Sequence, residues 1–121
     1  MHINLEASDR HTIQAYNENE VKINSLVYQN SLIVSNQEII TDWPVSTIHD
    51  LNHESLLFLL KYQPRIILLG HKTREYFAPM PVVQSLARQQ IALEVMSIGA
   101  ACRTFNVLLS EQREVVLGII L

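Results

Sequence analysis

The amino-acid sequence predicts an α/β protein, and two patterns along the chain carry that prediction. Near the start, short apolar runs alternate with polar residues at a spacing of two, and β-branched residues are frequent, which is typical of strands. Later in the chain, a strand, a helix and a strand follow one another, and a crossover of that length favours parallel pairing. An antiparallel layer followed by a βαβ unit is therefore the expected fold.

Length, charge and cysteine content limit the classes of protein to consider. The chain has 121 residues, is 48% hydrophobic, and is expected to form a single domain over residues 1–121. A net charge of -3 provides no broad basic field, so we do not expect nucleic acid as a partner. The segment after Met1 resembles neither a secretory signal nor a transit peptide, no apolar run is long enough to cross a bilayer, and Cys102 is the single cysteine. These observations favour a cytoplasmic protein that does not span a membrane.

The first part of the chain, residues 3–40, has the period-two spacing of short strands. Within it, Gln29–Ser31 separates two apolar runs and supplies residues that tolerate turn geometry, so Leu26–Val34 is expected to form a hairpin. Trp43–Pro44 ends this region, because proline restricts its own backbone and that of the preceding residue.

A helix is expected to begin after Asn52, because this residue type caps helix N-termini. Its buried face is expected to contain Leu56, Leu57 and Leu60, and it ends before Pro64.

The βαβ unit begins with Pro64–Gly70, an almost wholly apolar run that suits a central strand covered on both faces. Pro81 fits the first turn of a helix that runs to about Gln90, and Ile91–Ile98 is the next strand. An amphipathic helix then opens at Gly99, and β-branched residues near the C-terminus predict a last buried strand.

The segment Met96–Arg113, with the sequence MSIGAACRTFNVLLSEQR, closely resembles the C-terminal signature of the complex I assembly factor 3 family. Weaker matches occur in the same order along nearly the whole chain, including the Trp43–Pro44 step and the apolar strand that ends at Gly70. One departure is that relatives usually carry a second glycine after the Gly70 position, whereas His71–Lys72 follows it here. This departure from the relatives implies a bulkier loop at His71–Lys72.

For the fold, the resemblance implies three layers, with a mixed β-sheet flanked by helices and a smaller antiparallel β layer. For function, it implies that mitochondrial relatives are non-catalytic helpers in the assembly of respiratory complex I, while the small bacterial relatives have no settled role. Fold and family analogy leave the site itself to be argued from residues.

Candidate site residues lie at the carboxyl ends of the predicted parallel strands, where ligands of α/β proteins tend to bind. One end is Gly70–Lys72 and the other is Gly99–Thr104, and either Lys72 or Arg103 would supply a counter-charge for an anion. Alternatively, the small residues permit tight packing, and Arg103 pairs with an acidic neighbour. The candidate binding residues are Gly70, His71, Lys72, Gly99, Ala100, Arg103, Thr104 and Asn106.

Three further groups have both a functional and a structural interpretation. Cys102 at the start of a helix could act as a nucleophile with His71 as base, but lone cysteines are usually buried, and we predict no catalytic residue. His49 and His53 have the spacing of metal ligands on a helix, but a cap at Asn52 leaves His49 outside it, so no metal or cofactor is expected. Two aromatic residues, Trp43 and Phe77, could anchor a partner. Burial of both in the core is the favoured interpretation.

These observations lead to a first hypothesis and two alternatives. The first is a non-enzymatic assembly or adaptor protein that holds a partner protein through the Arg103–Asn106 helix face and the loop after Gly70. The alternative is a small-molecule or anion-binding protein, or an enzyme, that uses the cleft at Gly70 and Gly99–Arg103. A homo-oligomer formed through exposed strand edges is compatible with both.

Overall fold

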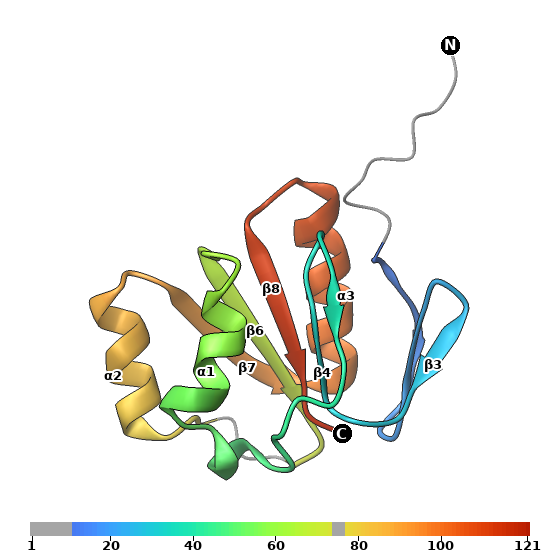
Figure 1. The fold of residues 1–121 in the computed structure, drawn as a ribbon. Helices are drawn as coiled ribbons and strands as arrows, with labels where there is room; N and C mark the ends of the chain where they lie inside the picture. Colours follow the sequence, from blue (N-terminus) through green and yellow to red (C-terminus); the bar gives the residue numbers. More distant parts are fainter. Residues whose placement is uncertain (1–10, 74–76) are drawn as a thin grey trace.

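A computed structural model describes residues 11–73 and 77–121, so the strand prediction for residues 3–10 lies outside the described residues. The described part contains a mixed five-stranded sheet, a separate antiparallel three-stranded sheet and three α-helices, which confirms the α/β prediction (Figure 1). The strands are β1 (Ile13–Tyr16), β2 (Val21–Ile23), β3 (Leu26–Tyr28), β4 (Leu32–Val34), β5 (Ile39–Ile40), β6 (Ile66–His71), β7 (Ala92–Ser97) and β8 (Val115–Ile119). The helices are α1 (His53–Leu60), α2 (Met80–Arg88) and α3 (Ile98–Ser110), and a 3₁₀ helix covers Ile48–Asp50.

The larger sheet has the strand order β5-β4-β8-β6-β7. Strand β6 is parallel to both of its neighbours, β7 and β8, whereas β4 is antiparallel to β8 and β5. The predicted apolar strand is thus internal, with both faces covered, and Ile67, Leu68 and Leu69 are each at most 1% exposed. The predicted parallel βαβ unit is confirmed as β6, α2 and β7.

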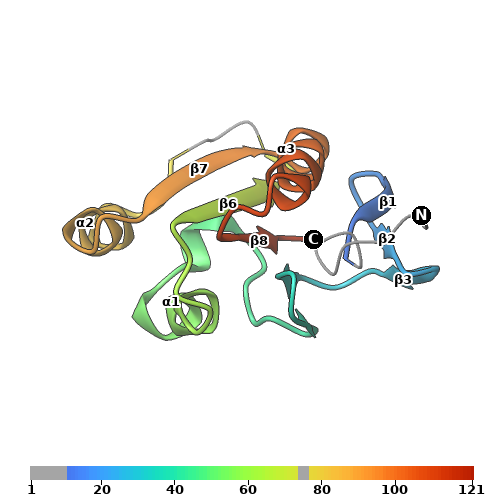
Figure 2. The ribbon, with the colours of Figure 1, turned by 90° about the horizontal axis from the view of Figure 1, so that it is seen from above.

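The elements form layers on the two faces of the larger sheet (Figure 2). Helices α1 and α2 cover one face, where their apolar side chains pack with Trp43 and Ile67. Helix α3 and the small sheet lie on the other face, where Phe105 packs with Leu68 and Ile13. This arrangement places the small sheet beside the N-terminal end of α3, where the candidate site lies.

The predicted hairpin over Leu26–Val34 is wrong, because its two strands belong to different sheets. Strand β3 pairs with β2, whereas β4 pairs with β5 and β8. The hairpin of this region joins β2 to β3 instead, through Asn24 and Ser25, whose φ angles of 52° and 68° give the left-handed turn that matches strand twist. The chain segment Gln29–Ser31 is therefore a crossing between sheets.

Helix α1 begins as predicted, but the phase of its buried face is different. The Asn52 side chain accepts a hydrogen bond from the Ser55 backbone N–H at 2.9 Å, which confirms the cap. The buried positions are Ser55, Leu56 and Leu59, whereas Leu57 is 51% exposed. Five successive large apolar residues follow Ser55, so their spacing does not fix which side of the helix faces the core.

Helices α2 and α3 are each followed, two residues after their last residue, by a glutamine with left-handed backbone angles, where glycine is the usual residue. Gln90 and Gln112 each have a φ of 59°, and the backbone N–H of the residue after each bonds back to a helical carbonyl. Such a cap satisfies carbonyl groups at the helix end. Helix α2 therefore ends at Arg88, close to the predicted Gln90.

Candidate functional site

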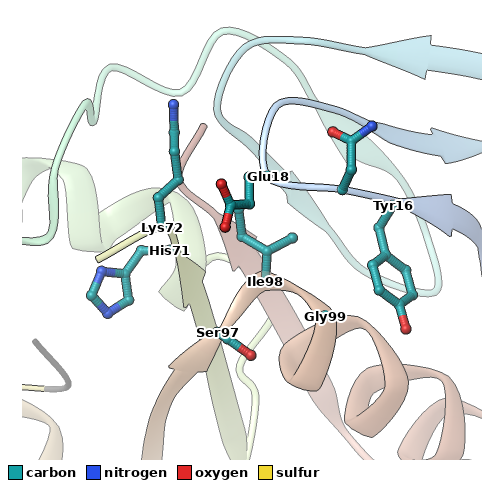
Figure 3. Close-up of a pocket in the computed structure, with 8 residues that line it drawn as sticks. Tyr16, Glu18, His71, Lys72, Ser97, Ile98 and Gly99 are labelled. Carbon is teal, nitrogen blue, oxygen red and sulfur yellow. The ribbon is translucent and has the colours of Figure 1, made fainter. Parts of the chain in front are cut away.

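A cavity of about 300 Å³ lies at the carboxyl end of β6, beside the first turn of α3 (Figure 3). Its walls come from three parts of the chain, namely the β1–β2 connection, the end of β6 and the β7–α3 junction. This is the position at which α/β sheets commonly hold ligands. The lining residues are Tyr16, Asn17, Glu18, His71, Lys72, Ser97, Ile98 and Gly99.

The cavity carries one formal charge of each sign. Glu18 and Lys72 are both exposed, and neither makes a hydrogen bond or an ion pair with the rest of the described chain. The imidazole of His71 is only 2% exposed, and its Nδ1 lies 3.0 Å from the Thr73 hydroxyl oxygen. The polar groups thus suit a ligand that has both an acidic and a basic group better than a simple anion.

The first turn of α3 is capped by its own chain. The Ser97 hydroxyl accepts a hydrogen bond from the Ala100 backbone N–H at 3.2 Å, so one of the free N–H groups at this helix start already has a partner. Ser97 was absent from the sequence-based candidates, because the helix was expected to open two residues later, at Gly99. The available signal was the serine directly before the apolar Ile98, because serine is a residue type that caps helix starts.

Both glycines among the candidates lie where a side chain would collide. A Cβ atom on Gly70 would approach the Ala101 Cβ to 2.9 Å and the Ile98 Cα to 3.1 Å, so glycine lets β6 pack directly against α3. A Cβ atom on Gly99 would lie 2.9 Å from Cε1 of Tyr16 and 3.2 Å from Nη1 of Arg103. The small residues thus serve close packing at this junction.

Two polar side chains of α3 connect it to β1 rather than to the cavity. The Arg103 guanidinium donates a hydrogen bond of 2.7 Å to the Tyr16 hydroxyl and lies near its ring. Asn106 accepts a hydrogen bond from the Ile13 N–H at 2.8 Å and donates one to the Ile13 carbonyl at 3.1 Å. The arginine partner is thus a tyrosine rather than the acidic neighbour considered from the sequence. Thr104 lies elsewhere on the helix, and its hydroxyl contacts the Met96 sulfur.

Cys102 is buried in the core between α3 and the sheet, which confirms the packing interpretation. Burial raises the pKa of its thiol to about 12, and the nearby Arg103 charge lowers that pKa by a smaller amount. A nucleophilic cysteine instead needs access and a lowered pKa.

The histidine and aromatic candidates separate in the structure. His49 belongs to the 3₁₀ helix and His53 begins α1, and no cluster of three metal-ligating side chains occurs within residues 11–73 and 77–121. Trp43 is 3% exposed and donates a hydrogen bond of 3.1 Å to the Ser55 carbonyl, so its predicted burial is confirmed. The burial predicted for Phe77 is wrong, because this side chain is 84% exposed.

The structure brings three of the eight candidate residues together in the cavity. His71, Lys72 and Gly99 line the cavity, and the other five do not. The cavity also uses Tyr16, Asn17 and Glu18, which sequence reasoning missed because the docking of the small sheet onto α3 is a long-range contact. The five candidates outside the lining are Gly70, Ala100, Arg103, Thr104 and Asn106.

Fold and site define a small mixed α/β protein with a cavity, lined by one acidic and one basic side chain, where its small sheet meets the carboxyl end of parallel strands. A family profile described as "Protein of unknown function (DUF498/DUF598)" matches residues 13–120. The chain belongs to this family, and relatives named as complex I assembly factor 3 confirm the resemblance stated from the sequence.

Three individual proteins illustrate the relationship. A Danio rerio protein named NADH dehydrogenase [ubiquinone] 1 alpha subcomplex assembly factor 3 is 37% identical over 76 residues, which are 61% of this chain and 44% of that protein. A Francisella tularensis subsp. holarctica protein named 13 kDa major membrane protein is 26% identical over 89 residues, or 73% of this chain and 72% of that protein. An NMR structure from Xanthomonas campestris is 34% identical, covers 99% of this chain and 92% of its own, and superimposes with a TM-score of 0.84.

The match to the assembly factor spans less than half of that protein's length. The helices of this chain, within the described residues, include none that is long and apolar enough to cross a membrane.

Proposed function

We propose that this protein is a non-enzymatic assembly or adaptor protein that binds a partner protein during the biogenesis of a respiratory complex. The observation that carries the proposal is the 37% identity to a protein named as a complex I assembly factor. The buried Cys102 thiol, with its raised pKa, favours binding over nucleophilic catalysis. We further propose that the protein acts in the cytoplasm. Nucleic acid is not a proposed partner, because a net charge of -3 provides no broad basic field.

The proposed recognition surface is the outer face of α3 together with Lys72 at the end of β6. Helical spacing places Arg103 and Val107 on one stripe, one turn apart, opposite the buried Phe105 and Leu109. Val107 is 55% exposed, and Arg103 is held in place by Tyr16. Arginine is one of the residue types enriched at the positions that contribute most to binding energy in protein interfaces, and the neighbouring valine adds apolar contact area.

Affinity capture from a native lysate, membrane fraction included, tests the proposal. The tagged wild-type protein is expected to enrich subunits of a respiratory complex, and Arg103→Ala and Val107→Ser are expected to reduce that enrichment by about tenfold. Arg113→Ala is the matched control, because Arg113 is exposed at the far end of α3. Circular dichroism must first establish that all variants are folded. Enrichment of unrelated proteins only, or equal enrichment by every variant, would overturn the proposal.

The second candidate function, a small-molecule or anion-binding protein or an enzyme, is favoured by the cavity of about 300 Å³ at the predicted strand ends. Its charged lining, Glu18 and Lys72, is open to solvent and suits a small zwitterion better than a simple anion. A ligand that binds the folded state raises the unfolding temperature, so a thermal-shift screen with amino acids, phosphate and carboxylates is the test. Stabilisation lost in Lys72→Ala and Glu18→Ala would support this function over the adaptor function.

Self-association is a further possibility that the sheet allows. Strand β7 ends the larger sheet and pairs only with β6 among the described strands, so it offers an edge for pairing with a second copy. Light scattering measures the molecular mass directly. A mass of one chain at micromolar concentration would exclude a stable homo-oligomer.

A further inference from the structure

A second cavity, a groove of about 450 Å³, lies between α1 and α2, remote from the α3 surface. Figures 1 and 2 both show these helices side by side on the same face of the larger sheet. We call this feature the α1–α2 groove. It is lined by Leu51, Asn52, His53, Leu56, Pro79, Pro81, Val82, Ser85 and Arg88.

The groove has an apolar floor that belongs to the protein core. Leu51, Leu56 and Val82 line it and are at most 4% exposed. Two prolines at the start of α2 form part of one wall. On the α1 side, Leu57 lies one turn after His53 and is 51% exposed, which extends the apolar surface beyond the groove. The surface is therefore concave and apolar, as in grooves that receive the apolar face of a helix.

The lining of the groove carries one formal positive charge, although the whole chain is acidic. Among its lining residues, Arg88 carries the formal charge, and its guanidinium makes no hydrogen bond or ion pair with the described residues. Arg88 lies in the last turn of α2, and the first turn of α1 also contains Glu54, which is not among the lining residues. The net charge of the chain is -3. A partner with a carboxylate near its apolar side chains would complement this local charge.

We propose that the α1–α2 groove binds an amphipathic segment of the partner protein, which inserts large apolar side chains between the helices and pairs a carboxylate with Arg88. This inference rests on the proposed adaptor function and adds a second contact surface with a defined partner chemistry. A concave groove selects a protruding segment rather than a flat lipid surface, and the positive charge of Arg88 selects an acidic one.

Site-specific photo-crosslinking tests the proposal on the full chain in the cells that produce it. A benzophenone amino acid replaces Ser85, which is half-buried on the groove wall. The matched control carries it at Asn36, which is exposed between β4 and β5 and lines neither the groove nor the α3 surface. The expected result is a crosslink from position 85 but not from 36, mapped by mass spectrometry to a segment that contains large apolar residues and an aspartate or glutamate.

Charge reversal then tests the role of the arginine. Arg88→Glu is expected to reduce the position-85 crosslink by about tenfold, whereas Arg113→Glu, an equal change of charge away from the groove, leaves it unchanged. Replacing the mapped acidic residue of the partner by arginine is expected to restore the crosslink to Arg88→Glu. Both arginines are exposed, so neither change removes a core contact.

Other outcomes would overturn the inference. A crosslink to lipid, to a second copy of this chain, or to a segment without acidic residues contradicts the proposed partner chemistry, as does the absence of any crosslink specific to position 85. If affinity capture still recovers respiratory-complex subunits in that case, the groove proposal fails while the adaptor function stands. If capture fails as well, both fail.

Discussion

Asn106→Ala is expected to destabilise the fold by detaching the small sheet from α3. The ladder between β1 and β2 is irregular between Ile13 and Ala15, and Asn106 bonds both the N–H and the carbonyl of Ile13 at this point. Each protein hydrogen bond contributes about 0.5–1.5 kcal/mol net, so the loss of two predicts a decrease of about 1–3 kcal/mol in the free energy of unfolding.

That decrease converts to a measurable shift in unfolding temperature. An unfolding entropy of about 2.1 cal/mol/K per residue gives about 0.25 kcal/mol/K for the 121-residue chain, and therefore about 4 °C per kcal/mol. Calorimetry should show the melting temperature of Asn106→Ala lowered by about 4–12 °C. Asn36→Ala is the matched control, because Asn36 is exposed and its side chain makes no hydrogen bond with the described residues. This control should melt within about 2 °C of wild type, the range expected of a surface substitution.

Hydrogen exchange locates the effect. The Ile13 amide should exchange faster in Asn106→Ala, because the side-chain oxygen that accepts its hydrogen bond has been removed. A loss below about 0.5 kcal/mol together with unchanged exchange at Ile13 would refute the assignment of Asn106 as the link between α3 and β1.

Further predictions concern four single positions. Gly70→Ala should lower the free energy of unfolding by about 1–3 kcal/mol in denaturant titrations, because its new Cβ meets the backbone and a buried side chain of α3. Gly99→Ala should change it by less than about 1 kcal/mol, because its new Cβ meets the exposed side chains of Tyr16 and Arg103 and no backbone atom. Gln112→Gly should raise the free energy of unfolding by about 0.5–1 kcal/mol in the same assay, because its φ of 59° favours glycine; a decrease would contradict this account of the helix end. Cys102 should resist iodoacetamide in the folded protein at pH 8.5 and react after unfolding. Burial raises the pKa of the Cys102 thiol in the folded state to about 12. The contribution of this thiol to stability is therefore complete below about pH 8.5 and is lost above it, by up to about 1.4 kcal/mol per pH unit. The free energy of unfolding of Cys102→Ala should lack this dependence on pH.

The sequence predicted those parts of the fold that local chemistry determines. The Asn52 cap and the parallel βαβ unit follow from residue type and element order, and both are confirmed. The hairpin error arose because β3 and β4 are each three residues long, and strands this short pair according to long-range burial. Leu26 is 60% exposed, whereas Leu32 is fully buried in the larger sheet. No local pattern distinguishes these two environments.

The candidate site was predictable only on the side formed by the βαβ unit. His71, Lys72 and Gly99 follow from the rule that ligands bind beyond the carboxyl ends of parallel strands. The opposite wall comes from the β1–β2 connection, which is more than fifty residues away in sequence from Lys72. Its place depends on contacts such as that between Arg103 and Tyr16, 87 residues apart, which no spacing along the chain reveals.

The same contacts that hold the small sheet also shape the cavity, so stability and binding are linked at this site. Tyr16 is a cavity wall and is bonded to Arg103, while Asn106 fixes the other end of β1. A ligand that touches both Glu18 and Lys72 would bridge the small sheet and the larger one, and would bind only the docked arrangement. By mass action it would therefore compensate part of the stability lost in Asn106→Ala. A protein partner that binds the outer face of α3 would stabilise the same docked state through Arg103, so the two candidate functions depend on one structural junction.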